Sequence, residues 1–235
     1  MNNNAYRVNR RWHITALIFL MITLTDASVT WLEMNELTRS EDLVQLYNES
    51  GEYKQRYILK YLPNWLETRS ISGLPGWAYD IIEYALFNAQ NGLHITEAVV
   101  LTEKYGLSEF YERLITLYKE AHNQHSVDSD NIRSAVVSAL DSFGGTIAEY
   151  AIPELLLNSR RYVIDREFSL LLGATARHSD TTLIPELEDI ERNVSGLADG
   201  VDEQVNPVFK NKYLAVLRLV QSVKQELVSR GGGDE

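Results

Sequence analysis

The chain has 235 residues, of which 45% are hydrophobic and 23% charged, and this composition fits a folded globular protein rather than a disordered chain. It contains no cysteine, which excludes disulfides, thiolate metal sites and thiol nucleophiles. Its 22 basic and 33 acidic residues give a net charge of -11, which disfavours binding to nucleic acid or to an anionic membrane.

The first 27 residues are expected to form a secretory signal peptide. Arg7, Arg10 and Arg11 precede an apolar run from Trp12 to Leu24, and small residues follow it before Ser28. The run has about 13 residues, whereas a helix that crosses a bilayer needs roughly 20. We therefore expect an extracytoplasmic protein, periplasmic or secreted. An uncleaved membrane anchor and a helix of the core are the alternatives.

After this segment, apolar residues recur at intervals of three and four, and no long stretch alternates with period two, so the sequence predicts an all-α fold. Ser40 is expected to be the N-cap of the first helix, Pro63 to end the second, and Asn91-Gly92 to stop the third. Polar residues 123–130 suggest an internal boundary. The helices expected before it cover residues 40–50, 52–62, 77–89, 96–105 and 108–122.

Beyond residue 127 the sequence becomes repetitive. The tetrapeptide Ile-Pro-Glu-Leu occurs at residues 152–155 and again 32 positions later, at residues 184–187. Arg133 and Arg166 stand 33 positions apart. Each unit reads as a helix, a short turn and a second helix, which is typical of helical repeat proteins.

Residues 128–194 resemble the HEAT-like helical repeat family. The family pattern has an arginine in the first helix, small and aliphatic residues along it, a glycine turn and an Ala-x-Pro-x-Leu start to the second helix. The first unit matches this pattern at Arg133, Ala135, Leu140, Gly144, Ala151, Pro153 and Leu155. The second unit matches it at Arg166, Leu171, Gly173, Pro185 and Leu187. The second unit has Phe168 where the first has Ala135.

The resemblance implies an α-solenoid-like stack of antiparallel helix pairs, in which each pair covers the apolar face of its neighbour. We expect residues 28–127, an aromatic-rich helical region, to belong to the same continuous domain as the repeat region, residues 128–230. The long amphipathic stretch 208–228 is expected to cap the stack, and residues 231–235 to form a disordered tail.

Recognisable catalytic signatures are missing from the sequence. It has neither a Gly-x-Ser-x-Gly elbow nor a phosphate-binding loop nor a zinc-protease helix. His122 and His125 stand near a helix C-terminus, where imidazoles interact favourably with the helix dipole without binding a metal. We predict no catalytic residue, metal or cofactor. Whether the chain is an enzyme stays open, with a non-enzymatic role favoured.

Four acidic residues are candidates for binding a partner: Glu149, Glu154, Glu186 and Asp189. They lie off the apolar face of the second helices of the two repeats. In HEAT-like proteins these second helices line the concave surface, so the resemblance implies an acidic groove that would select a basic protein segment or peptide. The alternative is that all four are ordinary solvated residues.

Tyrosines form a second candidate site in the N-terminal helices. Tyr53, Tyr57 and Tyr61 stand four apart on one helix and are interleaved with lysines and an arginine. Such a stripe can stack a sugar or a peptide, but a stripe that packs in the core is the more common arrangement.

These patterns favour an exported, non-enzymatic helical-repeat scaffold that binds a protein or peptide through an acidic concave groove. The alternative is an extracytoplasmic enzyme or carbohydrate-binding protein with a carboxylate and aromatic cleft in its N-terminal helices. No nucleic acid partner and no permanent membrane insertion after signal cleavage are expected. The identity of the partner and the oligomeric state are left open.

Overall fold

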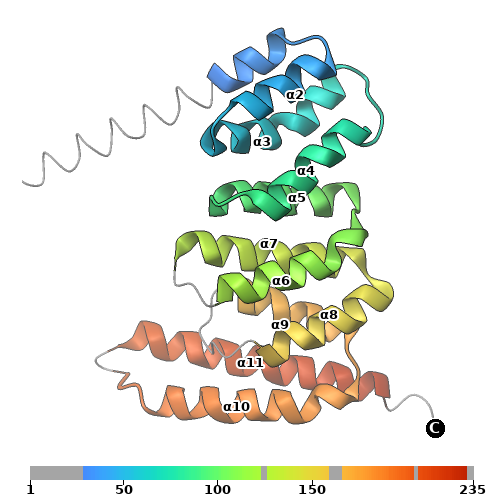
Figure 1. Cartoon of the computed structure of the whole chain (residues 1–235). Coiled ribbons are helices and arrows are strands. Elements are labelled where there is room, and N and C mark those ends of the chain that lie inside the picture. The colour runs from blue at the N-terminus through green and yellow to red at the C-terminus, as the bar shows by residue number, and fades with distance from the viewer. Residues whose placement is uncertain (1–28, 123–125, 159–165, 204–205, 232–235) are drawn as a thin grey trace, which may run out of the picture. The chain divides into compact units, whose positions relative to one another are not determined.

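The computed structural model describes residues 29–122, 126–158, 166–203 and 206–231, and in these residues all regular structure is helical (Figure 1). The predicted all-α class is therefore confirmed. Residues 29–36, called here the leading helix, come first. The helices that follow are α2 Ser40–Glu49, α3 Glu52–Thr68, α4 Gly76–Asn88, α5 Gly92–Tyr105, α6 Tyr111–His122, α7 Val127–Phe143, α8 Gly145–Asn158, α9 Arg166–His178, α10 Ile184–Asp199 and α11 Pro207–Gly231, with 3₁₀ turns at Ser108–Phe110 and Thr181–Leu183.

The predicted signal peptide, residues 1–27, lies outside the described residues. Each helix within the described ranges is either too short or too polar to cross a bilayer.

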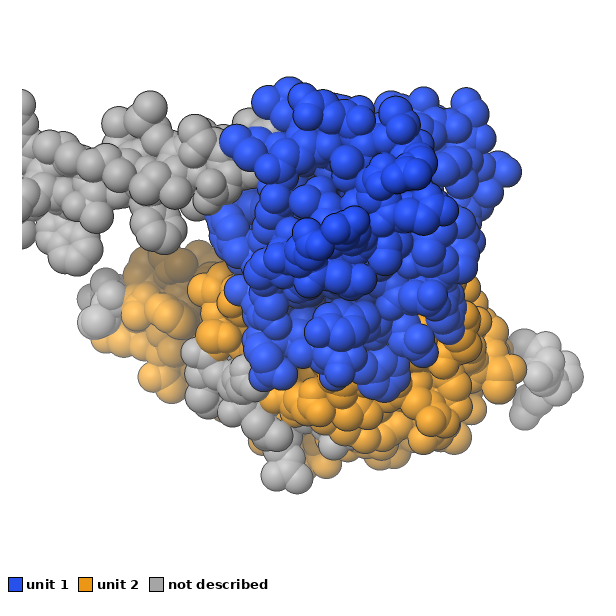
Figure 2. All heavy atoms as spheres, turned by 45° about the horizontal axis from the view of Figure 1, so that its top comes forward, with its two compact units in different colours: residues 1–97 blue, residues 98–235 orange. Residues whose placement is uncertain are grey.

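The chain divides into two compact units, residues 1–97 (unit 1) and residues 98–235 (unit 2), which Figure 2 distinguishes by colour. The division falls between Glu97 and Ala98, inside α5. The described part of the polar run expected to mark an internal boundary, residues 126–130, instead caps and begins α7, within unit 2.

Helix α3 continues through Pro63 to Thr68, so the prediction that Pro63 ends this helix is wrong. Proline lacks an N–H, and it therefore removes the hydrogen bond that the carbonyl of Leu59 would otherwise accept. The helix continues because its last turns bury Trp65 and Leu66. Burial of these two side chains stabilises α3 by about 3–6 kcal/mol, which exceeds the cost of about 3 kcal/mol for an internal proline.

Asn91 starts α5 and does not stop the preceding helix, which ends at Asn88. The Asn91 side-chain oxygen accepts the backbone N–H groups of Leu93 (3.0 Å) and His94 (3.2 Å), as an N-cap residue does. The expectation that α5 begins at Thr96 placed its start four residues too late. Ser40, expected to be the N-cap of α2, is instead its first helical residue.

Trp65 joins α3 to the leading helix inside unit 1. The Trp65 side chain is 1% exposed, and its indole N–H donates a hydrogen bond to the carbonyl of Met34 at 2.8 Å. The guanidinium of Arg69 lies 4.1 Å from the Trp65 ring centre. It also donates hydrogen bonds to the carbonyls of Asn35 (3.2 Å) and Leu37. Arg69 thus satisfies carbonyls at the end of the leading helix that have no partner within the helix.

Unit 2 is built from helices that pack in a regular order. Helix α6 packs against α7, α8 against α9, and α10 against α11. Within the same unit α7 also packs against α9, and α9 against α11 (Figure 1). The contacting faces are apolar and well buried, because each helix repeats its aliphatic residues at intervals of three and four.

A buried group of polar side chains lies among α6, α7 and α9. The Arg133 side chain is fully buried and contacts the Glu167 carboxylate at 3.5 Å, the Asp130 carboxylate at 2.5 Å and the carbonyl of Ala121 at 3.1 Å. Tyr118 donates a further hydrogen bond to Glu167. Because an unpaired buried charge is costly, these contacts hold the three helices in one register.

The two copies of the repeated tetrapeptide occupy different places in their helices. Ile152 and Pro153 lie in the middle of α8, whereas Ile184 and Pro185 begin α10. Gly173, equivalent to Gly144 in the sequence pattern, lies inside α9 and not in a turn.

The joint between α7 and α8 consists of Gly144 and Gly145. Both residues have positive φ, 63° and 51°, a conformation that glycine adopts without strain. The two helices are therefore joined by a turn with almost no connecting loop.

Candidate functional site

The predicted tyrosine stripe forms a stack on one side of α3. The rings of Tyr53 and Tyr57 lie 5.3 Å apart edge to face, those of Tyr57 and Tyr61 lie 6.3 Å apart, and Trp31 of the leading helix contacts Tyr61 at 5.2 Å. Tyr57 is 8% exposed, whereas Tyr53 is 39% exposed. The rings mainly contact one another, and Tyr53 is the member of the stripe most open to solvent.

Two of the cations interleaved with these tyrosines form ion pairs inside unit 1. Lys54 pairs with Glu33 at 2.5 Å, and Arg56 pairs with Glu97 at 3.6 Å while lying 5.3 Å from the ring centre of Tyr57. This arrangement favours packing over ligand binding for the stripe.

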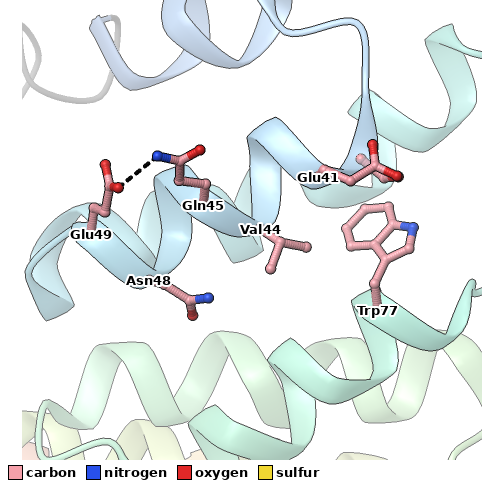
Figure 3. Close-up of a pocket in the computed structure, with 7 residues that line it drawn as sticks. Glu41, Val44, Gln45, Asn48, Glu49 and Trp77 are labelled. Atoms are coloured by element: carbon pink, nitrogen blue, oxygen red, sulfur yellow. Dashed lines mark hydrogen bonds between the residues drawn. The ribbon is translucent and has the colours of Figure 1, made fainter.

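A cleft that the sequence did not reveal lies between α2 and the start of α4. Its volume is about 440 Å³, and its lining residues are Ser40, Glu41, Val44, Gln45, Asn48, Glu49 and Trp77. In Figure 3 the Trp77 indole lies below the Glu41 carboxylate and to the right of Val44. The α2 residues recur at intervals of three and four, the spacing of one helix face, and this is the signal from which the cleft wall could have been found.

Neighbouring side chains hold the walls of this α2–α4 cleft in place. Trp77 packs edge to face against the buried Trp65, with ring centres 5.8 Å apart. The Gln45 amide donates to one oxygen of Glu49 at 2.7 Å (Figure 3). The lining contains two carboxylates and no lysine, arginine or histidine. The cleft thus combines an aromatic ring, two amides and negative charge.

The four acidic residues predicted on α8 and α10 have different surroundings. Glu149 is exposed, and Glu186 is half-buried in the first turn of α10. Glu154 forms an ion pair with Lys119 of α6, and Asp189 pairs with Arg192 of its own helix at 2.8 Å. Part of the expected negative charge is therefore compensated by cations of the chain.

Glu149 also lines a cleft of about 520 Å³ that includes Arg177, His178 and Arg230. Asp141 accepts hydrogen bonds from Arg177 (2.6 and 2.9 Å) and from His178 (2.9 Å). Burial opposes ionisation of Asp141, but these hydrogen bonds outweigh it and hold the pKa of this carboxyl below its usual value. The cleft in unit 2 thus contains both acidic and basic side chains. The sequences of α8 and α10 alone did not predict the basic ones.

His94 is fully buried in unit 1 and contacts Tyr47. The hydroxyl of Tyr47 lies 2.9 Å from Nε2 of His94, and Nδ1 of His94 is buried without a hydrogen-bond partner. Burial lowers the pKa of His94 below its usual value and raises the pKa of Tyr47. The negative charge of Glu52 acts in the opposite direction on His94 but is the smaller effect.

The stability of the chain is therefore expected to fall as the pH is lowered from about 7 to 5.5. The unfolded chain binds a proton at His94 near the usual pKa of about 6.5, whereas the folded chain does not, so acid favours the unfolded state by up to about 1.4 kcal/mol per pH unit. Thermal unfolding measured at several pH values should show this slope. His94→Gln should flatten it, and an equal slope in the variant would contradict the assignment to His94.

Within the described residues, no three histidine, aspartate or glutamate side chains gather in a group able to hold a metal ion. Of the two histidines considered in the sequence, His122 stacks on Tyr118 with ring centres 6.4 Å apart. His125 lies outside the described residues.

Comparison of the chain with family models, with curated protein sequences and with solved structures gave no match.

Proposed function

We propose that the chain is an exported, non-enzymatic scaffold whose helical repeats bind a protein or peptide partner carrying a basic segment. The observation that carries this proposal is the packing order in unit 2. Successive helix pairs α6–α7, α8–α9 and α10–α11 are linked through α7, α9 and α11, as expected for a short α-solenoid.

This packing order shifts the boundaries of the proposed repeat units by one helix. The sequence pattern pairs α7 with α8 and α9 with α10, whereas the packing favours pairs that begin one helix earlier. The contacts α7–α9 and α9–α11 link one layer of the proposed stack. In the second layer α6 packs against α8, and α10 joins the stack through α11. Since each pair of such a stack covers the apolar surface of the next, we expect α11 to cap it, as terminal elements of a solenoid must.

Solenoids bind partners along the surface of one helix layer, and the acidic residues of α8 and α10 lie in one such layer of the proposed stack. Within the described part of the chain, Glu154 and Asp189 form ion pairs, whereas Glu149 and Glu186 do not. A net charge of -11 for the whole chain also favours encounter with a basic partner. The resemblance to HEAT-like repeats remains part of this proposal.

The proposed export rests on the first 27 residues, and the N-terminal sequence of the native protein tests it directly. A native chain that begins near Ser28 supports cleavage of a signal peptide. A chain that keeps its first residues and is found in the membrane supports the alternative of an anchored protein.

We expect the double variant Glu149→Lys and Glu186→Lys to bind its partner at least about tenfold more weakly, because like charges would then face each other. The partner is isolated by cross-linking from the native extracytoplasmic fraction, identified, purified and titrated against both forms of the chain.

Asp199→Lys is the matched control, because Asp199 is exposed and ends the same helix that Glu186 begins. Equal affinity of the double variant and the native chain for this partner would show that these acidic residues do not form the binding surface.

A further inference from the structure

The α2–α4 cleft of unit 1 differs from the other described cavities in being lined by carboxylates and an aromatic ring with no lysine, arginine or histidine. Glu41 and Glu49 lie at opposite ends of α2, and Trp77 stands across from the first of them (Figure 3). Arg39, the arginine just before α2, pairs with Asp42 at 2.7 Å and does not line the cleft. The two carboxylates therefore leave this surface with an uncompensated negative charge.

The Trp77 ring offers a surface for a cation. It is only partly buried, and its contact with Trp65 fixes its orientation. The face of an indole carries negative charge density, which attracts a guanidinium or ammonium group. Glu41 lies beside the ring, so a cation there would meet the carboxylate and the ring together.

The other end of the cleft also favours positive charge. Glu49 is the last residue of α2, where carbonyl groups without helical partners add partial negative charge. The hydrogen bond from Gln45 fixes one oxygen of the Glu49 carboxylate. A ligand that covered these carboxylates without supplying a cation would remove them from water uncompensated, which is costly.

We propose that the α2–α4 cleft binds the cationic side chains of an extended peptide segment, with an arginine or lysine over Trp77 beside Glu41 and a second cation near Glu49. A volume of about 440 Å³ is within the range of pockets that hold small ligands and accommodates a few residues of peptide. The amides of Gln45 and Asn48 are available to bond the peptide backbone between the two cations.

This inference goes beyond the scaffold function, because it needs neither the stacking of repeats nor the acidic residues of α8 and α10. The substitutions that test it lie in unit 1, whereas those that test the scaffold lie in unit 2. Either proposal can therefore fail while the other stands.

The test is a calorimetric titration of the full chain with a short peptide that carries two arginines separated by glycines. A matched peptide, in which neutral citrulline replaces both arginines, keeps the shape and hydrogen bonding but removes the charge. We expect the arginine peptide to bind, the citrulline peptide to bind at least about tenfold more weakly, and added salt to weaken the complex.

The double variant Glu41→Gln and Glu49→Gln should weaken binding of the arginine peptide at least about tenfold. Both residues are exposed, so this change leaves the core untouched. Glu36→Gln with Glu83→Gln is the matched control, since these are also exposed acids of unit 1 but lie outside the cleft. Trp77→Leu should weaken binding as well, and Trp77→Phe should retain part of it.

Three results would overturn the proposal. The first is no binding of the arginine peptide, and the second is equal binding of the citrulline peptide. The third is equal loss of affinity in the control pair. If the arginine peptide does not bind, and a neutral oligosaccharide binds the native chain but not the Trp77→Leu variant, the cleft would be assigned to a sugar.

Discussion

Replacing Arg133 with methionine is expected to destabilise unit 2 by about 3–5 kcal/mol. The substitution leaves the Glu167 carboxylate, itself 3% exposed, without its cation in the interior. It also removes the hydrogen bond to the Ala121 carbonyl. Since whole domains are stable by only about 5–15 kcal/mol, the loss should be a large part of the total.

Urea unfolding followed by far-ultraviolet circular dichroism measures this loss. All four tryptophans of the chain precede residue 98, so tryptophan fluorescence reports on unit 1 and provides an internal reference. Adding Glu167→Leu to Arg133→Met should restore part of the lost stability, because no buried charge then lacks a partner. A single variant as stable as the native chain would show that the pair contributes nothing.

Replacing Trp65 with alanine is expected to destabilise unit 1 by about 3–5 kcal/mol. The change empties the space that the indole fills between α3 and the leading helix and removes the packing partner of Trp77. The Met34 carbonyl also loses the N–H that it accepts from Trp65. Arg69 loses the ring over which its guanidinium lies.

Trp65→Phe separates these contributions, because it keeps an aromatic ring and removes only the indole N–H and part of the volume. We expect this variant to lose about 1–2 kcal/mol. Unfolding is followed by the fluorescence of the remaining tryptophans, all of which precede residue 98 and among which Trp31 and Trp77 lie in the described part of unit 1. Equal stability of the alanine variant and the phenylalanine variant would contradict the filling of a buried space as the main effect.

The all-α class was predictable from the sequence because apolar periodicity depends on residue type alone. The ends of helices were harder to predict, since tertiary burial competes with local signals. Pro63 is a strong local stop, yet the burial of Trp65 and Leu66 beyond it extends α3. The start of α7 was missed because Ser126 and Ser129 cap each other within a run that reads as a polar loop.

The candidate sites could be predicted only in part, for a similar reason. Tyr53, Tyr57 and Tyr61 do share one side of α3, because helical spacing alone places them there. The α2–α4 cleft could not be predicted, since Trp77 reaches α2 only through the fold of unit 1. The cations beside Glu149 come from α9 and α11, and no pattern along α8 indicates them.

The joint of Gly144 and Gly145 constrains how this sequence can evolve. No atom lies within 4 Å of the point where a Cβ would stand at either residue, so the restriction is on the backbone alone. Gly144, with φ 63° and ψ -168°, lies in a region that essentially only glycine adopts. At Gly145, where φ is 51°, asparagine and aspartate are the main alternatives to glycine. In descendants that keep this turn, position 144 should remain glycine and position 145 should change only within that small set, while nearby surface positions vary freely.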